Sequence, residues 1–309
     1  MTRAVLPLLA LAAVLAPLAS ADTKSYPAGD FTGIDTRGVI DVVFETGPIA
    51  SINVDEENGD FSDIYIEQSG DTLEIGRNSL RDGFGWSRNV SIKTDNDRKV
   101  VKVNGKRVPS YTVHIIAPTL AETSVSNSSS MTATGLDSPT FSGSVSSSSD
   151  LILSGTAGDV DLRASSSADL DASNLEAHAL KLDVSSSADA LALVRDGRLD
   201  LDASSSADVN VKALGATKVI VDASSSADVE LSGTCQALEI SASSSADVEA
   251  HNLKCATGDI RASSGADVSA FLSDSVEAKA SSGADISVAG NPPSRDVSKS
   301  SGGDIEING

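Results

Sequence analysis

Apolar and polar residues alternate with a period of two along most of the chain, which is the pattern of β-strands with one buried face. Up to residue 124 this alternation predicts several short strands, at residues 39–44, 52–54, 64–66, 73–75, 90–92, 100–103 and 111–116. From residue 125 onward it continues without any stretch of helical periodicity. We therefore expect an all-β protein.

A short Ser-rich phrase returns through the second part of the chain and always ends in Asp. It reads SSSSD, SSSAD, SSGAD or SSGGD, and successive copies are 18 to 20 residues apart. The Asp residues that end it are Asp150, Asp169, Asp189, Asp208, Asp228, Asp247, Asp267, Asp285 and Asp304. An earlier SSSM that ends at Met131, 19 residues before Asp150, resembles a degenerate first copy. Ser-rich segments are often disordered, but apolar residues such as Leu162 and Leu170 flank the phrases at strand spacing, which a flexible linker lacks.

A repeat of 19 or 20 residues is too short for a pair of helices or a propeller blade, but it suits one coil of a β-solenoid. Stacked coils pair as parallel strands about 4.8 Å apart, so equivalent side chains form columns along a rod. One coil cannot bury its apolar side alone, whereas stacking encloses the Leu, Val and Ile columns. We predict a right-handed parallel β-helix of about ten coils with an N-terminal β cap region.

The two cysteines test this register. Cys235 and Cys255 are 20 residues apart, which places them at equivalent positions on adjacent coils. Cα atoms about 4.8 Å apart are within the range that a disulfide spans, and we predict this bridge. The alternative is a pair of reduced thiols buried as small apolar groups. Because there is no CxxC pair and His114, His178 and His251 are scattered, the sequence has no zinc-site signature.

An N-terminal leader and an acidic composition define the expected location and partners. Residues 1–21 contain Arg3, an apolar run and a final Ala-Ser-Ala, which together have the form of a secretory signal peptide. We expect cleavage before Asp22 and not a membrane anchor, since the apolar run is too short to span a bilayer. No later segment resembles a membrane span, so we expect no transmembrane segment in the mature chain and a periplasmic, extracellular or cell-surface location. With 23 basic and 44 acidic residues, the 309-residue chain has a formal charge of −21, which excludes nucleic-acid binding.

Residues 22–124 lack the Ser-rich phrase and form an N-terminal β region that continues into the solenoid at 125–309. Within it, residues 77–107 hold a basic island, with an Asn104-Gly105 hairpin signal and a Gly-rich tip that carries Trp86. One interpretation is a solvated hairpin that covers the first coil, since the end of a solenoid needs a cap. The other is that Arg81, Trp86 and Arg88 contact an anionic partner or a sugar.

Several motifs resemble one known family. They are FTGI at 31–34, GVIDVVFETG at 38–47, GDTLEIG at 70–76, YTVHIIAPTLAETSVSNSSS at 111–130 and the repeated S-[SG]-[AG]-D-[VI]. On these motifs the chain resembles the head-GIN domain family, also called DUF2807 or the auto-transporter adhesin head domain, over nearly the whole mature sequence. The resemblance implies a right-handed β-helix, bacterial export, and an adhesive or binding role. The partner that we expect is an envelope or extracellular ligand, a glycan or a protein. It brings no catalytic residues.

The Asp residues that end the phrases should form a column on the rod. If the strand runs unbroken through ASSSADV, the first and third Ser and the Asp point outward and the middle Ser points inward. Gly265, Gly283 and Gly302 instead hint at a bend that interrupts this alternation. Carboxylates about 4.8 Å apart repel by roughly 0.9 kcal/mol per pair even in water. Three explanations stay open: hydrogen bonds from Ser hydroxyls or turn N–H groups, Ca²⁺ bridging adjacent carboxylates, or a hydroxyl array that binds ice or a polysaccharide.

We expect no catalytic activity, because the regular Asp column marks no single site and Arg163, Arg261 and Lys279 are isolated. No nucleophile elbow, phosphate loop or dinucleotide motif occurs either. The expected function is that of an exported, adhesin-like interaction module, with Ca²⁺ as the only cofactor considered. The last coil ends without an obvious cap, so we expect a second copy or a partner to cover its edge.

Overall fold

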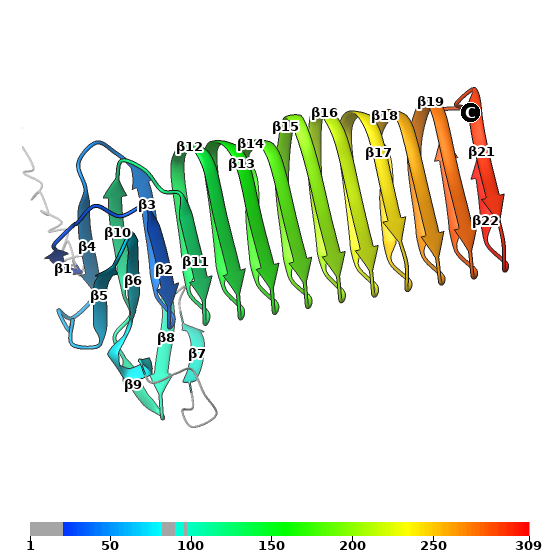
Figure 1. Ribbon diagram of the computed structural model, residues 1–309. Helices are drawn as coiled ribbons and strands as arrows, with labels where there is room; N and C mark the ends of the chain where they lie inside the picture. The colour runs from blue at the N-terminus through cyan, green and yellow to red at the C-terminus, as the bar shows by residue number, and fades with distance from the viewer. Residues whose placement is uncertain (1–20, 82–89, 96–97, 309) are drawn as a thin grey trace, which may run out of the picture.

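Apolar and polar residues alternate along each repeat, so each repeat forms one long β-strand that curves around the rod. The computed structural model describes residues 21–81, 90–95 and 98–308, and there the chain forms a parallel β-solenoid of about nine turns with a strand cap at its N-terminal end (Figure 1). The coil strands are β12 (Ser130–Ser146), β13 (Asp150–Ser165), β14 (Asp169–Ser185), β15 (Asp189–Ser204), β16 (Asp208–Ser224), β17 (Asp228–Ala242), β18 (Asp247–Ser263) and β19 (Asp267–Ser281). The predicted solenoid is confirmed.

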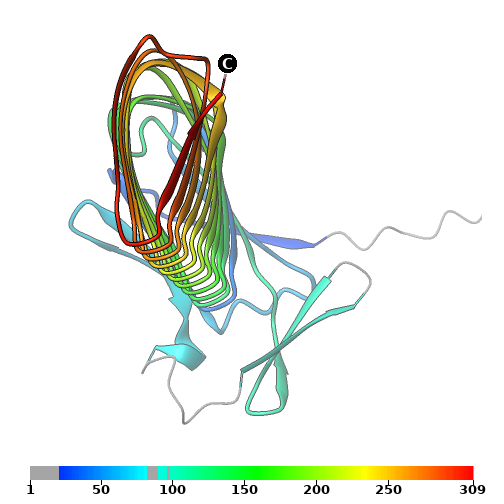
Figure 2. The same cartoon turned by 90° about the vertical axis from the view of Figure 1, so that its right-hand side faces the viewer.

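The repeat period sets the register between coils. Asp169 lies between Asp150 and Asp189 on the neighbouring coils, and the same position continues to Asp304. The residue after each Asp, such as Leu170, points inward and is buried, so the coils superpose as flattened loops around one apolar core when viewed along the rod (Figure 2). The first copy is shifted by one residue from the prediction, because Ser130, and not Met131, lies opposite Asp150.

Each Ser-rich phrase forms a tight turn at the narrow edge of the rod. The second and third Ser of a phrase, such as Ser166 and Ser167, both have left-handed backbone angles, with φ of 60° and 57°. The strand is therefore interrupted, and the middle Ser is exposed instead of pointing inward. Adjacent turns are joined by hydrogen bonds, as where the N–H of Ser167 donates to the carbonyl of Ser186 at 3.0 Å. This ladder holds the Ser residues in a conformation that they rarely adopt.

The N-terminal cap extends both walls of the rod beyond the first coil. One wall continues from β12 through β3 (Asp41–Thr46), β10 (Thr112–Ala117), β4 (Ser51–Glu56) and β1 (Asp22–Tyr26). The other continues through β11 (Glu122–Ser126), β2 (Gly33–Arg37), β6 (Thr72–Arg77) and β5 (Ile64–Ser69). In both walls the last strands are antiparallel, so the regular stack ends there.

A buried arginine closes the first turn of the stack. In the described chain no coil precedes the turn at Gly38 and Val39, so no neighbouring turn donates hydrogen bonds to its carbonyls. The side chain of Arg77 supplies these donors instead. Its Nε donates to the carbonyl of Gly38 at 2.6 Å and its Nη2 to that of Val39 at 3.0 Å. Asp63 pairs with the guanidinium at 3.2 Å, and the ring of Tyr111 lies 5.0 Å away. Arg77 was counted in the solvated basic island, and this was wrong because its side chain is fully buried.

The rest of the basic segment forms a separate sheet. A 3-10 turn, η1 (Asn78–Leu80), leads out of the cap, and β7 (Val90–Asp95), β8 (Arg98–Val103) and β9 (Lys106–Val108) make an antiparallel sheet. The predicted hairpin turn lies at Asn104 and Gly105, where both φ angles are positive. In both overall views the sheet stands away from the stacked coils, beside the start of the rod (Figures 1 and 2).

The far end of the rod has charged residues where the other coils have core. The last coil consists of β20 (Asp285–Ala289), β21 (Ser294–Lys299) and β22 (Asp304–Ile307). Arg295 and Lys299 lie in register with the buried Val276 and Ala280 of the coil before. Charged residues at inward positions hinder further pairing of an edge strand. Coverage of this edge by a second copy or a partner stays a prediction.

The predicted signal peptide, residues 1–21, lies outside the described residues apart from Ala21. Strand β1 begins at Asp22, the residue expected to follow cleavage. Among the described residues, no helix is long and apolar enough to cross a membrane.

Candidate functional site

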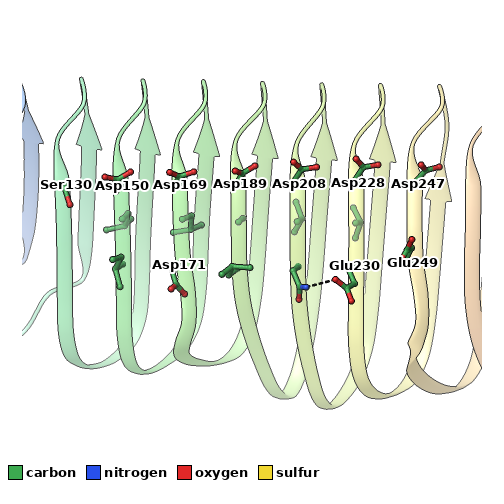
Figure 3. A pocket seen from close by; sticks show the side chains of 18 residues that line it. Ser130, Asp150, Asp169, Asp171, Asp189, Asp208, Asp228, Glu230, Asp247 and Glu249 are labelled. Carbon is green, nitrogen blue, oxygen red and sulfur yellow. Dashed lines mark hydrogen bonds between the residues drawn. The ribbon is translucent and has the colours of Figure 1, made fainter. Parts of the chain in front are cut away.

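The first half of each coil strand contributes to one outward surface, which we name the Asp face. Its first row is the Asp column, from Asp150 to Asp304. Its second row lies two residues further along each strand and comprises Ile152, Asp171, Leu191, Asn210, Glu230 and Glu249. A groove of about 880 Å³ follows the two rows from β12 to β18, and the column carboxylates stand side by side along it (Figure 3).

Strand alternation positions both rows. The residue between them, such as Val209, points into the core, so the two rows face solvent about 6–7 Å apart. The second row changes character along the rod. Ile152 and Leu191 are 41% and 46% exposed, whereas Glu230 and Glu249 add carboxylates further on. The groove is therefore acidic along its whole length and has exposed apolar side chains in its N-terminal half.

The carboxylates of the column raise one another's pKa. Partial burial raises the pKa of Asp169, Asp189, Asp228 and Asp267, and the adjacent column carboxylates raise it further. At the end of the column a hydrogen bond from Lys299 lowers the pKa of Asp304. Within the part of the chain that the structure describes, no Lys, Arg or Ser side chain bonds to the column from Asp150 to Asp285. The expected hydrogen bonds from Ser hydroxyls are thus not found there.

The opposite wall has a different charge pattern. Arg163 pairs with Asp161 at 2.7 Å, and Arg261 pairs with Asp259 at the same distance. Further pairs join Lys181 to Asp183, Arg198 to Asp200, Lys218 to Glu239 and Lys279 to Glu277. The expectation that Arg163, Arg261 and Lys279 are isolated was wrong, because residues two apart on a strand share a face. These basic residues all have acidic partners on this wall, but the wall also has excess negative charge, since burial and the neighbouring Asp183 and Asp222 raise the pKa of Asp202. The column from Asp150 to Asp285 differs in having no cationic partner among the described residues.

The residues considered for metal binding form no compact group. Among the described residues, no set of three or more His, Cys, Asp or Glu is placed to hold a metal ion. Ca²⁺ takes six to eight oxygen ligands, which a single row of carboxylates supplies only in part. The calcium alternative therefore depends on pairs of column residues and on water.

The other predicted site residues are distributed along the molecule. The structure joins Cys235 and Cys255 by a disulfide, with Cα atoms 4.5 Å apart in the register that their spacing implies. Trp86 and Arg88 lie outside the described residues. Arg81 is already engaged, since it pairs with Glu67 and stacks on the ring of Tyr65 at 4.5 Å. The proposed contact at this tip is therefore untested for two of its three residues.

Comparison with known proteins identifies the family. The model of the family described as "Putative auto-transporter adhesin, head GIN domain" matches residues 30–196 and 191–292. The chain belongs to the head-GIN family. No curated protein matches it significantly.

Two solved structures similar to this head-GIN chain come from species of Parabacteroides. One, a "putative lipid binding protein" from Parabacteroides distasonis, is 16% identical, with a TM-score of 0.45 and coverage of 93% of this chain and 96% of its own. A "putative adhesin" from Parabacteroides merdae is 17% identical, with a TM-score of 0.47 and the same coverage.

Sequence reasoning found the Asp column but missed the second row of the groove. Ile152, Leu191 and Glu230 belong to no repeated phrase, because this position varies from coil to coil. These residues could have been found from their position relative to the column Asp residues. Combining the strand period of two with the repeat period of 19 or 20 puts every residue two after a column Asp on the same face.

Proposed function

We propose that this protein is an exported, non-catalytic, adhesin-like module that binds a ligand of the cell envelope or its surroundings through the groove of the Asp face. The observation that carries the proposal is the contrast between the two walls of the rod. On the opposite wall basic residues pair with acidic neighbours, as at Arg163 and Asp161, whereas the column from Asp150 to Asp285 has no cationic partner among the described residues.

The unpaired column is unfavourable for the fold alone. Each adjacent pair of carboxylates costs roughly 0.9 kcal/mol in water, and partial burial adds to this, as the raised pKa values indicate. Asn has nearly the same shape and would remove the repulsion. A ligand that places positive charge or hydroxyl donors along the column would offset this cost when bound, which supports a binding role.

The shape of the groove favours an elongated ligand. Seven coil strands line it, from β12 to β18, so it extends about 29 Å along the rod. Exposed Ile152 and Leu191 add apolar contact beside the carboxylates. A polymer or a protein with cationic or hydroxyl groups fits this arrangement better than a small molecule does. Such a large ligand is also what an adhesive role at the cell surface requires.

The test measures binding of the mature protein to a glycan array and to intact bacterial cells. The groove variant is Asp189→Asn with Asp208→Asn, and the matched control is Asp161→Asn with Asp200→Asn on the opposite wall. We expect the groove variant to lose binding and the control to keep it. Equal binding by both would place the ligand elsewhere. Fractionation with N-terminal sequencing should find the mature chain outside the cytoplasm and starting at Asp22, and retention of residues 1–21 inside the cell would contradict export.

The turn edge is a second candidate surface. Each turn has two exposed Ser residues. Equivalent Ser residues on adjacent coils, such as Ser206 and Ser226, form a regular row of hydroxyls about 4.8 Å apart. At Gly283 and Gly302 a side chain would meet nothing within 4 Å, so the edge is open to contact from outside. Binding to ice or to an insoluble polysaccharide that Ser206→Gly with Ser226→Gly abolishes would favour this surface over the groove.

A further inference from the structure

We propose that the groove of the Asp face receives the basic face of the β7–β9 sheet of a second copy of this chain. The interaction of the proposed adhesive module is then homophilic. This inference rests on the proposed function, because it names the partner of the same groove.

The two faces of the β7–β9 sheet differ: buried valines lie on one, with Lys106 at its edge, and three exposed basic residues lie on the other. Val101 and Val103 of β8 point to one side and are only 1% and 7% exposed. Lys102, between them, points to the other side and lies opposite Arg107 of β9. Lys93 of β7 is on this same face, since it pairs with Val100, two residues from Lys102. All three basic residues are exposed, so the outer face of the sheet is positively charged.

The two faces have the same spacing, because both are β-sheets. Neighbouring strands are about 4.8 Å apart in the β7–β9 sheet and in the stack of coils. Lys102 and Arg107, on adjacent strands, therefore match two consecutive carboxylates of the column, such as Asp208 and Asp189.

The third basic residue matches the second row of the groove. Lys93 lies two residues along β7 from Ser91, which is opposite Lys102. Glu230 lies two residues along β17 from Asp228, the column residue next to Asp208. With β7, β8 and β9 laid over β17, β16 and β15, Lys93 reaches the second row at Glu230 while Lys102 and Arg107 reach the first.

Charge distribution favours this chain as its own partner. The chain has a formal charge of −21, and residues 77–107 are its one basic island. On the rod, basic residues such as Lys181 and Arg198 are paired with acidic neighbours. The basic sheet stands beside the start of the rod (Figure 1). The carboxylates that it matches line the groove on β15 to β17, further along the rod, so the contact joins two copies. Because the two surfaces differ, each copy can accept one neighbour and dock into another, and chains of copies result.

The test is sedimentation velocity of the mature chain at about 20 mM and about 500 mM salt, since surface charge pairs are screened at high salt. We expect concentration-dependent growth at low salt that is lost at high salt. Lys102→Glu with Arg107→Glu, and separately Asp189→Lys with Asp208→Lys, should each weaken association more than about tenfold. Lys181→Glu with Arg198→Glu on the opposite wall makes the same change of charge and should leave association unchanged.

Mixing the two defective variants makes the test specific. The first keeps an intact groove and the second keeps an intact basic sheet, so an equimolar mixture should form 1:1 dimers and nothing longer. Circular dichroism of each variant checks its fold. A wild-type chain that stays monomeric at low salt, or a mixture that fails to dimerise, overturns the proposal. Association that survives both double variants but is lost in Val297→Lys would place the contact at the last coil and also overturn it.

Failure here is separable from failure of the proposed function. If the chain is monomeric but Asp189→Asn with Asp208→Asn still abolishes binding to cells or glycans, the groove is a binding site for a different partner. If neither association nor binding depends on the groove, both proposals are wrong.

Discussion

Replacing Arg77 by Met should detach the cap from the solenoid. The substitution keeps a long unbranched side chain but leaves the carbonyls of Gly38 and Val39 and the carboxylate of Asp63 without the guanidinium. Removing one partner of a buried ion pair costs about 3–5 kcal/mol. Asp63 keeps hydrogen bonds from the N–H and hydroxyl of Ser79, at 2.7 and 2.9 Å, which places the expected loss near the lower end, at about 3 kcal/mol.

The loss should be local, because each coil of a solenoid contacts only its neighbours. Hydrogen exchange followed by mass spectrometry should show faster exchange in residues 31–46 and 63–77, with little change beyond β14. Arg163→Met is the matched control. Arg163 is in an exposed ion pair, and its loss should cost under about 1 kcal/mol. If Arg77→Met and Arg163→Met have equal effects on urea unfolding and exchange, the capping role of Arg77 is refuted.

Four further predictions concern the turns, the column, calcium and the cap. Ser206→Gly should raise the free energy of unfolding by about 0.5–1 kcal/mol, because Ser206 has a φ of 59° that glycine adopts freely; a loss in urea titrations would mean that the hydroxyl makes compensating bonds. The pKa of Asp228 is raised in the folded state, so protonation of Asp228 favours folding. The melting temperature should therefore rise as the pH falls from neutral to about 4. In Asp228→Asn that gain should shrink, and an unchanged gain would contradict the repulsion within the column. Melting in millimolar calcium and in chelator should give the same temperature, and a calcium-specific rise would revive ion bridging. Burial raises the pKa of Tyr111 from 10.0 to about 12, so stability present below pH 10 should be lost as pH rises to about 12, and Tyr111→Phe should remove this step in alkaline unfolding curves.

The fold could be predicted because local and global signals agree. A strand alternation of two and a repeat of 19 or 20 residues are compatible only if the coils stack, and the positions of Cys235 and Cys255 fit the same register. The tight turns were harder to predict. Ser at both left-handed positions is unusual, and only Gly265, Gly283 and Gly302 hinted at a bend. The backbone ladder between turns, which stabilises this conformation, requires the neighbouring coils to be in place.

The role of a charged residue could not be predicted from its position in the sequence. Arg77 and Lys102 belong to one basic island, yet one is buried in the cap and the other is exposed on a separate sheet. Arg163 looked isolated among acidic residues, but Asp161 lies beside it on the same face. Ion pairing depends on the direction of each side chain and on its neighbours across coils, which a list of charges does not contain.

The sequence by itself determined the stacked architecture and the existence of the Asp column, because a short coil buries its apolar residues only when its equivalents lie above and below it. The tertiary structure alone decided which surface keeps unpaired charge and which segment closes the first turn. Both depend on contacts between residues far apart in the chain, such as Arg77 with Gly38 and the second row with the column, and no local pattern specifies these contacts.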